Sequence, residues 1–197
     1  MIQPELLAAR AGYEPDAFGS LYDRYYTRVY NYLRYRLDDD ASAEELCAQV
    51  FERLLGHIRR YDPERGPFEP WLFAIARNAL RDHWRRMKLR RFLPLDTLNR
   101  KASAAVSPEE QAVRDEEIES LKRALSALDG RERDLLGLKF AAGLTNREIA
   151  QMTGLTESNV GVILYRAVQK LKKITTGEGR PIDTAAPARI EVDHERA

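Results

Sequence analysis

The segment from residue 67 to residue 91, PFEPWLFAIARNALRDHWRRMKLRR, constrains the fold of this chain more than any other. Its apolar residues recur at the three- and four-residue steps of a buried helical stripe, and its cationic residues follow the same steps on another face. The apolar stripe is Leu72, Ile75, Ala76, Ala79 and His83, and the cationic stripe is Arg77, Arg81, Arg85 and Lys88. Residues 77–91 hold seven Lys or Arg and one acid, although the 197-residue chain has a formal net charge of only +1. The segment therefore predicts an amphipathic helix with concentrated positive charge on its outer side.

Aromatic residues lie beside this cationic stripe. Phe68, Trp71 and Trp84 flank it, and the preceding turn-rich loop, YDPERGP, has two prolines and a glycine. A run of arginines alone is as consistent with a solvated helix face as with a binding surface. Rings next to phosphate-binding cations are the usual surface for unstacked bases, so the combination favours nucleic acid as the ligand.

Helical signals dominate the rest of the chain, and they predict an all-α fold of two small helical domains joined by a flexible linker. In the first domain, residues 1–91, we expect a helix over residues 16–36 and a second to about residue 59. Ser42 with Glu45 forms a predicted capping box for the second helix. The cationic helix is the third, and Glu69 and Pro70 suit its first turn.

Residues 92–106 have mixed composition and no sustained period, which predicts the linker. The second domain is predicted over residues 107–175, where Ser107, Pro108 and Glu110 open a fourth helix. Residues 176–197 contain few large apolar groups, so we expect a disordered tail.

The second domain has the layout of a helix-turn-helix. Asp129 with Glu132 and Thr145 with Glu148 are predicted caps of two helices, and a further helix opens after Gly154. The last helix would then present one side to a DNA major groove, although an ordinary helical hairpin packed on a partner protein is the alternative. The candidate DNA-binding residues at this helix are Thr156, Ser158, Asn159, Val162, Tyr165, Arg166 and Lys170.

Other classes of function lack their sequence signals. Cys47 is the only cysteine and the three histidines are scattered, so we expect no disulfide, no metal site and no cofactor. We find no catalytic constellation, and a helical enzyme or metal-binding bundle would need inward Glu-x-x-His pairs on several helices, whereas the one such spacing, Glu191 with His194, falls in the expected tail. The chain has no apolar run long enough to span a membrane and no signal peptide, so we expect a cytoplasmic protein that is not an enzyme.

Two motifs in this order are similar to those of the extracytoplasmic-function (group IV) sigma factors of the sigma-70 family, which serve bacterial RNA polymerase. The first motif is AEELCAQVFERL, residues 43–54, and the second is F..WL..IARN...D..RR, from Phe68 to Arg86. The resemblance covers residues 18–174. It implies that residues 1–91 form sigma region 2 and that residues 107–175 form sigma region 4.

The resemblance implies three contact surfaces. The candidates for binding core RNA polymerase are Glu45, Gln49 and Glu52. The candidates for binding and melting the −10 promoter element are Tyr61, Phe68, Arg77, Asn78, Arg81, Arg85 and Lys88. The helix after Thr156 would read the −35 element of promoter DNA. An anti-sigma factor is a further implied partner.

The chain departs from the family pattern at four positions in two motifs. Ala48 and Gln49 stand where the polymerase-docking motif usually has an amide and an acid, and Gly161 and Ile163 stand where the recognition helix is usually basic. The alternative function is a stand-alone helix-turn-helix transcriptional regulator, which would bind duplex DNA tightly without polymerase. That alternative leaves the aromatic loop and the cationic helix without a role.

Overall fold

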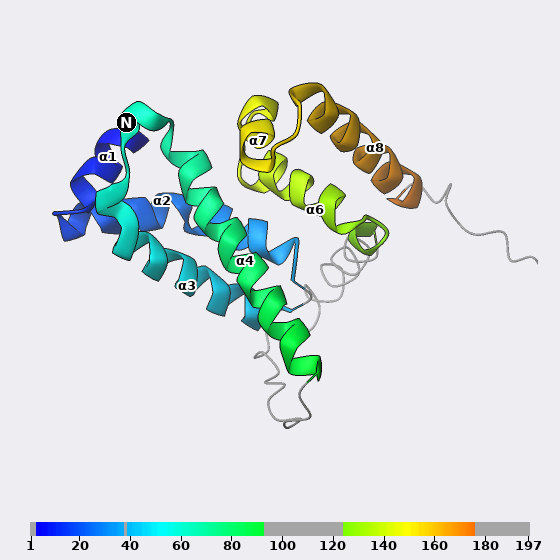
Figure 1. Ribbon diagram of the computed structural model, residues 1–197, viewed down its shortest axis with the longest axis horizontal. Coiled ribbons are helices and arrows are strands. Elements are labelled where there is room, and N and C mark those ends of the chain that lie inside the picture. Colours follow the sequence, from blue (N-terminus) through cyan, green and yellow to red (C-terminus); the bar gives the residue numbers. More distant parts are fainter. Residues whose placement is uncertain (1–2, 38, 93–123, 176–197) are drawn as a thin grey trace, which may run out of the picture.

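The computed structural model describes residues 3–37, 39–92 and 124–175, and the regular elements within those ranges are all helical (Figure 1). The all-α prediction is therefore confirmed. The predicted linker after residue 92, the fourth helix opened by Ser107 and the tail after residue 175 lie outside the described residues.

The N-terminal unit consists of four helices and two short turns of 3-10 helix. They are α1 (Pro4–Ala11), α2 (Pro15–Arg34), α3 (Asp40–His57), η1 (Ile58–Arg60), η2 (Pro63–Arg65) and α4 (Phe68–Phe92). Helix α1 was not predicted, because its eight residues are too few for a clear apolar period. Its buried Leu7, Ala8 and Ala11 nevertheless join the core beside α2.

The core of this unit is formed by the apolar stripes of α2, α3 and α4, which pack side by side (Figure 1). Large side chains from all three helices are fully buried, among them Tyr25 and Leu33 of α2, Leu46 and Leu54 of α3, and Leu72 and Phe73 of α4. Removing that much apolar surface from water stabilises each helix far more than its intrinsic propensity does. This packing therefore determines which residues of α3 and α4 face outward.

The predicted capping box of α3 is wrong. The cap is Asp39, whose Oδ1 accepts a hydrogen bond from the Ser42 backbone N–H at 2.7 Å. Asp39 outranks Ser42 because an aspartate placed three residues before that amide satisfies it and also meets the positive end of the helix dipole. The two boxes predicted for the second domain, Asp129 with Glu132 and Thr145 with Glu148, are both present.

The C-terminal unit contains α6 (Gly130–Leu136), a π-helical continuation η3 (Gly137–Ala141), α7 (Asn146–Thr153) and α8 (Glu157–Thr175). Gly154 ends α7 with φ of 73°, the left-handed conformation that glycine adopts without steric strain. This corner turns the chain directly into α8, whose Val160, Leu164 and Ala167 are buried. Helices α7 and α8 form the predicted helix-turn-helix.

The two units pack on each other. Buried residues of α2, α3 and α4 form one continuous hydrophobic cluster with residues of α6, η3, α7 and α8. Helix α2 lies against η3, and α4 lies against α7 (Figure 1). Sequence analysis predicted the two units but not this contact between them.

Candidate nucleic-acid interface

The outer face of α4 carries most of the predicted −10 contacts. Asn78, Arg81, Arg85 and Lys88 are all exposed, as the cationic stripe requires. Each lies within three to four residues of the next, so the four form a continuous row on the helix. Such a row can follow the phosphates of a DNA strand.

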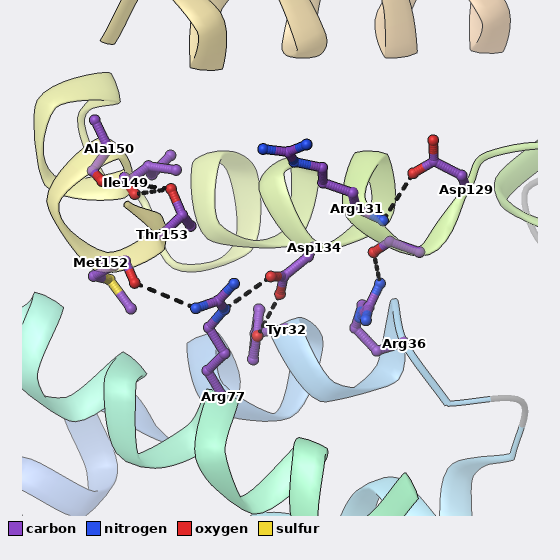
Figure 2. A network of polar contacts seen from close by, with 11 residues as sticks. Tyr32, Arg36, Arg77, Asp129, Arg131, Asp134, Ile149, Ala150, Met152 and Thr153 are labelled. Carbon is purple, nitrogen blue, oxygen red and sulfur yellow. Dashed lines mark hydrogen bonds and ion pairs between the residues drawn. The ribbon is translucent and has the colours of Figure 1, made fainter. Parts of the chain in front are cut away.

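Arg77 belongs to the same stripe but faces the C-terminal unit. Its side chain is 17% exposed, and its Nε donates to Asp134 Oδ2 at 2.8 Å. Its Nη1 also donates to the Met152 carbonyl of α7 at 3.3 Å. Figure 2 shows Asp134 between Arg77 and Tyr32, whose hydroxyl donates to Asp134 Oδ1 at 2.8 Å. In this arrangement the Arg77 guanidinium is occupied by protein groups.

Phe68 is placed differently from the prediction. It is 0% exposed, and its ring lies 5.3 Å from the Tyr25 ring and 5.4 Å from the Tyr61 ring, measured between centroids. A base cannot stack on a ring that is closed in on both sides, so we reassign Phe68 to core packing. The error arose because the helix was predicted to begin at Glu69 and Pro70, which assigned Phe68 to the loop; α4 begins at Phe68, four residues before Leu72 on the buried stripe.

The half-buried rings beside Phe68 are Tyr61 and Trp71, whose centroids are 5.3 Å apart. The Tyr61 hydroxyl donates to the Gly66 carbonyl at 3.0 Å, and burial raises the pKa of that hydroxyl to about 12. Gly66 has φ of 146°, which favours glycine and closes the loop sharply. The loop thus holds two partly accessible rings at the start of α4.

The face of α8 that is predicted to read DNA is exposed. Thr156 caps the helix, since its Oγ1 accepts the Asn159 backbone N–H at 3.2 Å. The predicted groove-facing residues are exposed, namely Ser158, Asn159, Val162, Tyr165 and Arg166. Lys170 differs, because its ammonium lies 2.6 Å from Glu132 Oε1 of α6. Its charge is therefore partly neutralised within the unit.

The polymerase-docking candidates lie on one side of α3. Glu45 and Glu52 are exposed, and half-buried Gln49 between them donates from Nε2 to Glu45 Oε1 at 3.1 Å. The Tyr22 ring of α2, 39% exposed, lies 4.7 Å from the Phe51 ring of α3. Sequence analysis missed Tyr22 as a surface residue because its position also fits the apolar stripe of α2.

Neither a metal-ligand cluster nor a membrane-spanning helix is found within the described residues. No group of three or more His, Cys, Asp or Glu is arranged to hold a metal ion there. None of the described helices is both long and apolar enough to cross a membrane.

Comparison with known proteins agrees with this geometry. The profile of sigma-70 region 2 matches residues 21–90, and the profile of sigma-70, region 4 matches residues 118–171. The ECF RNA polymerase sigma factor SigM of Bacillus subtilis is 30% identical over 154 residues, which are 78% of this chain and 92% of SigM. The chain belongs to the ECF sigma factors. This membership supports an RNA polymerase sigma factor over a stand-alone regulator.

A further ECF sigma factor and two solved structures are also similar to this chain. The sigma factor BldN of Streptomyces coelicolor is 32% identical over 172 residues, which cover 87% of this chain and 65% of BldN. Among solved structures, CnrH in complex with the cytosolic domain of CnrY has a TM-score of 0.66 at 24% identity, covering 88% of this chain and 97% of that one. RpoE in complex with the anti-sigma factor NepR from Bartonella quintana has a TM-score of 0.62 at 16% identity, covering 81% of this chain and 96% of that one. These two structures share the fold.

Proposed function

We propose that this ECF sigma factor directs core RNA polymerase to promoters by reading a −35 element with α8 and by melting and holding the −10 element with α4 and its preceding loop. The observation that carries the proposal is the joint exposure of two DNA-directed faces in one sigma-family chain. Asn78, Arg81 and Arg85 are exposed on α4, and Asn159 and Arg166 are exposed on α8.

At the −10 element, the physical task is to offset the free energy lost when bases unstack, a few kcal/mol for each base. The exposed cations of α4 supply attraction to the phosphates of the separated strand. Tyr61 and Trp71 are half-buried, so one face of this ring pair can accept an extruded base without losing the packing that fixes it. Asn78 adds an amide that can hydrogen-bond to a base edge or a phosphate.

At the −35 element, the last helix of the helix-turn-helix would enter the major groove. Ser158, Asn159 and Arg166 can hydrogen-bond to base edges, and Val162, 46% exposed, can contact a thymine methyl group. Arg166 is the one charged member of this set. The α8 face would therefore supply position and modest specificity, and the phosphate contacts would come from lysines farther along the helix.

The outer side of α3 would dock on polymerase through Glu45, Gln49 and Glu52. We further propose that an anti-sigma factor controls the protein, as NepR is paired with RpoE. The chain would act by binding and not by catalysis, in the cytoplasm, where polymerase and promoters are found.

In vitro transcription with core polymerase on a promoter library tests docking, melting and sequence choice together. Arg81→Ala should reduce permanganate reactivity of the −10 region while leaving the circular dichroism melt unchanged, because Arg81 is exposed. Arg131→Ala, which removes an exposed arginine from α6, is the matched control. If the protein neither co-elutes with core polymerase nor yields transcripts, the proposal is wrong. Tight duplex binding by the free protein in that case would identify a stand-alone regulator.

A further inference from the structure

We propose that the free protein holds itself in a closed state, in which Asp134 of the C-terminal unit occupies Arg77 and keeps it from the DNA strand. The inference rests on the proposed function, because it assigns regulation to one of the proposed −10 contacts. It predicts that the contact between the two units must open before the N-terminal unit can hold a melted strand fully.

Asp134 is the centre of the contact. It lies on α6, is 8% exposed, and uses both carboxylate oxygens on the N-terminal unit. Its Oδ1 accepts from the hydroxyl of Tyr32, which is 0% exposed on α2, and its Oδ2 accepts from Arg77 Nε on α4, each at 2.8 Å (Figure 2). One carboxylate therefore joins two N-terminal helices to the C-terminal unit.

Three further polar contacts between the two units run in the same direction. Arg28 donates to the Ala142 carbonyl, Arg36 donates to the Gly130 carbonyl, and Arg77 donates to the Met152 carbonyl. In all of these contacts the N-terminal unit donates and the C-terminal unit accepts. Phosphate oxygens of DNA offer the same acceptor chemistry, so a DNA strand and the C-terminal unit compete for Arg77, the donor among these that is a proposed −10 contact.

The competition is direct at Arg77. With the side chain 17% exposed and its Nε and Nη1 already bonded, a strand phosphate cannot form the paired contact with these two nitrogens while α6 and α7 lie against them. The reading face of α8 is not covered in the same way, since Tyr165 is 66% exposed. The closed state thus restricts engagement of the −10 strand more than contact with the −35 duplex.

Gly137 shows that the close approach depends on one missing atom. A Cβ built there would lie 2.9 Å from Cδ2 and 3.3 Å from Cε2 of the buried Tyr32 ring, too close for real atoms. The backbone itself does not require glycine, because its φ of −59° and ψ of −45° are ordinary helical values. Alanine at this position should therefore suit the helix within the C-terminal unit and oppose only the contact with α2.

The test measures the distance between the units by double electron–electron resonance on the full chain, with spin labels at Ala48→Cys and Gln151→Cys. Both positions are exposed, whereas the native Cys47 is buried and should not be labelled. We expect a narrow distance distribution for this labelled protein. Adding Gly137→Ala should broaden it and lengthen the mean distance. Gly56→Ala is the matched control, because a Cβ there meets nothing within 4 Å.

A second readout uses the unlabelled free protein and a single-stranded −10 oligonucleotide. Gly137→Ala should raise the affinity of the protein for this oligonucleotide by about tenfold. Tyr32→Phe removes one hydrogen bond to a charged acceptor but keeps the ring, and it should also raise this affinity. Circular dichroism verifies that each variant folds. If Gly137→Ala does not fold, the distance distribution and the oligonucleotide affinity of Tyr32→Phe test the closed state instead. A broad distribution in the otherwise unchanged protein, or unchanged distances and affinity in the folded variants, overturns the closed state. A narrow distribution that opens on substitution, with no transcription under any condition, would instead overturn the proposed function and leave the contact standing.

Discussion

The most direct test of the aromatic cluster is the substitution Phe68→Ala. The ring is fully buried and lies within 6.0 Å, between centroids, of the rings of Tyr25, Tyr61 and Trp71. Truncating a buried phenylalanine costs about 3–5 kcal/mol, because apolar transfer energy is lost and a cavity remains. Since a domain of this kind has a total stability of about 5–15 kcal/mol, Phe68→Ala should remove about a fifth of it or more.

Urea denaturation followed by far-ultraviolet circular dichroism measures this loss, with Phe68→Leu as a milder variant that keeps most of the apolar volume. Asn78→Ala, an exposed residue of α4, should unfold at nearly the same urea concentration as the original protein. If Phe68→Ala unfolds like the original protein but no longer opens promoters, the ring is a base contact and our reassignment of it to the core is refuted.

Three further predictions concern single positions. Gly154→Ala should lower the free energy of unfolding by about 1–2 kcal/mol, because alanine is strained at φ of 73°. Thermal denaturation measures the loss. Gly19→Ala is the control, because a Cβ at either glycine meets nothing within 4 Å. Gly161→Ala should stabilise α8 by about 1 kcal/mol, because an added Cβ would lie at an ordinary 3.7 Å from its nearest neighbour, Asn146 Nδ2. Weaker binding of this variant to a −35 duplex would indicate that the backbone at this position approaches DNA closely. Unchanged binding would contradict that hypothesis. Burial raises the pKa of the Cys47 thiol to about 12, so the folded state keeps a proton that the unfolded state releases above about pH 8.5, and the free energy of unfolding should fall by up to about 2 kcal/mol by pH 10. Urea denaturation at pH 8 and pH 10 should show a smaller fall for Cys47→Ala, and an equal fall would contradict the assignment.

The helices that carry long apolar stripes were predictable from the sequence. The stripes of α2, α3 and α4 have a clear period, and the helix-turn-helix has capping residues at Thr145 and Thr156 with a glycine corner between them. Boundaries were less predictable, as Asp39 shows, because several capping residues stand close together and their competition depends on backbone geometry. The domain limits near residues 91 and 107 stay predictions.

The candidate site was predictable where it faces solvent and not where it faces protein. The outward row of α4 follows from helical geometry alone, so Asn78, Arg81, Arg85 and Lys88 are exposed as their spacing requires. Arg77 lies on the same stripe and has the same chemistry. Its direction toward Asp134 depends on where a separate helical unit is placed, and no local period encodes that placement.

The energetics of the Asp134 contact suit a reversible switch better than a permanent bond. Bringing the carboxylate and the Arg77 guanidinium out of water costs hydration energy that offsets much of their attraction, and separating the units returns both groups to water together. Separating the units therefore costs little electrostatic free energy, whereas removing only one member of the ion pair leaves the other buried and unpaired. For this reason substitution of Asp134 alone would confuse loss of the closed state with local destabilisation. Gly137→Ala avoids that problem, because it leaves every charge in place and changes only how closely α2 and η3 can approach.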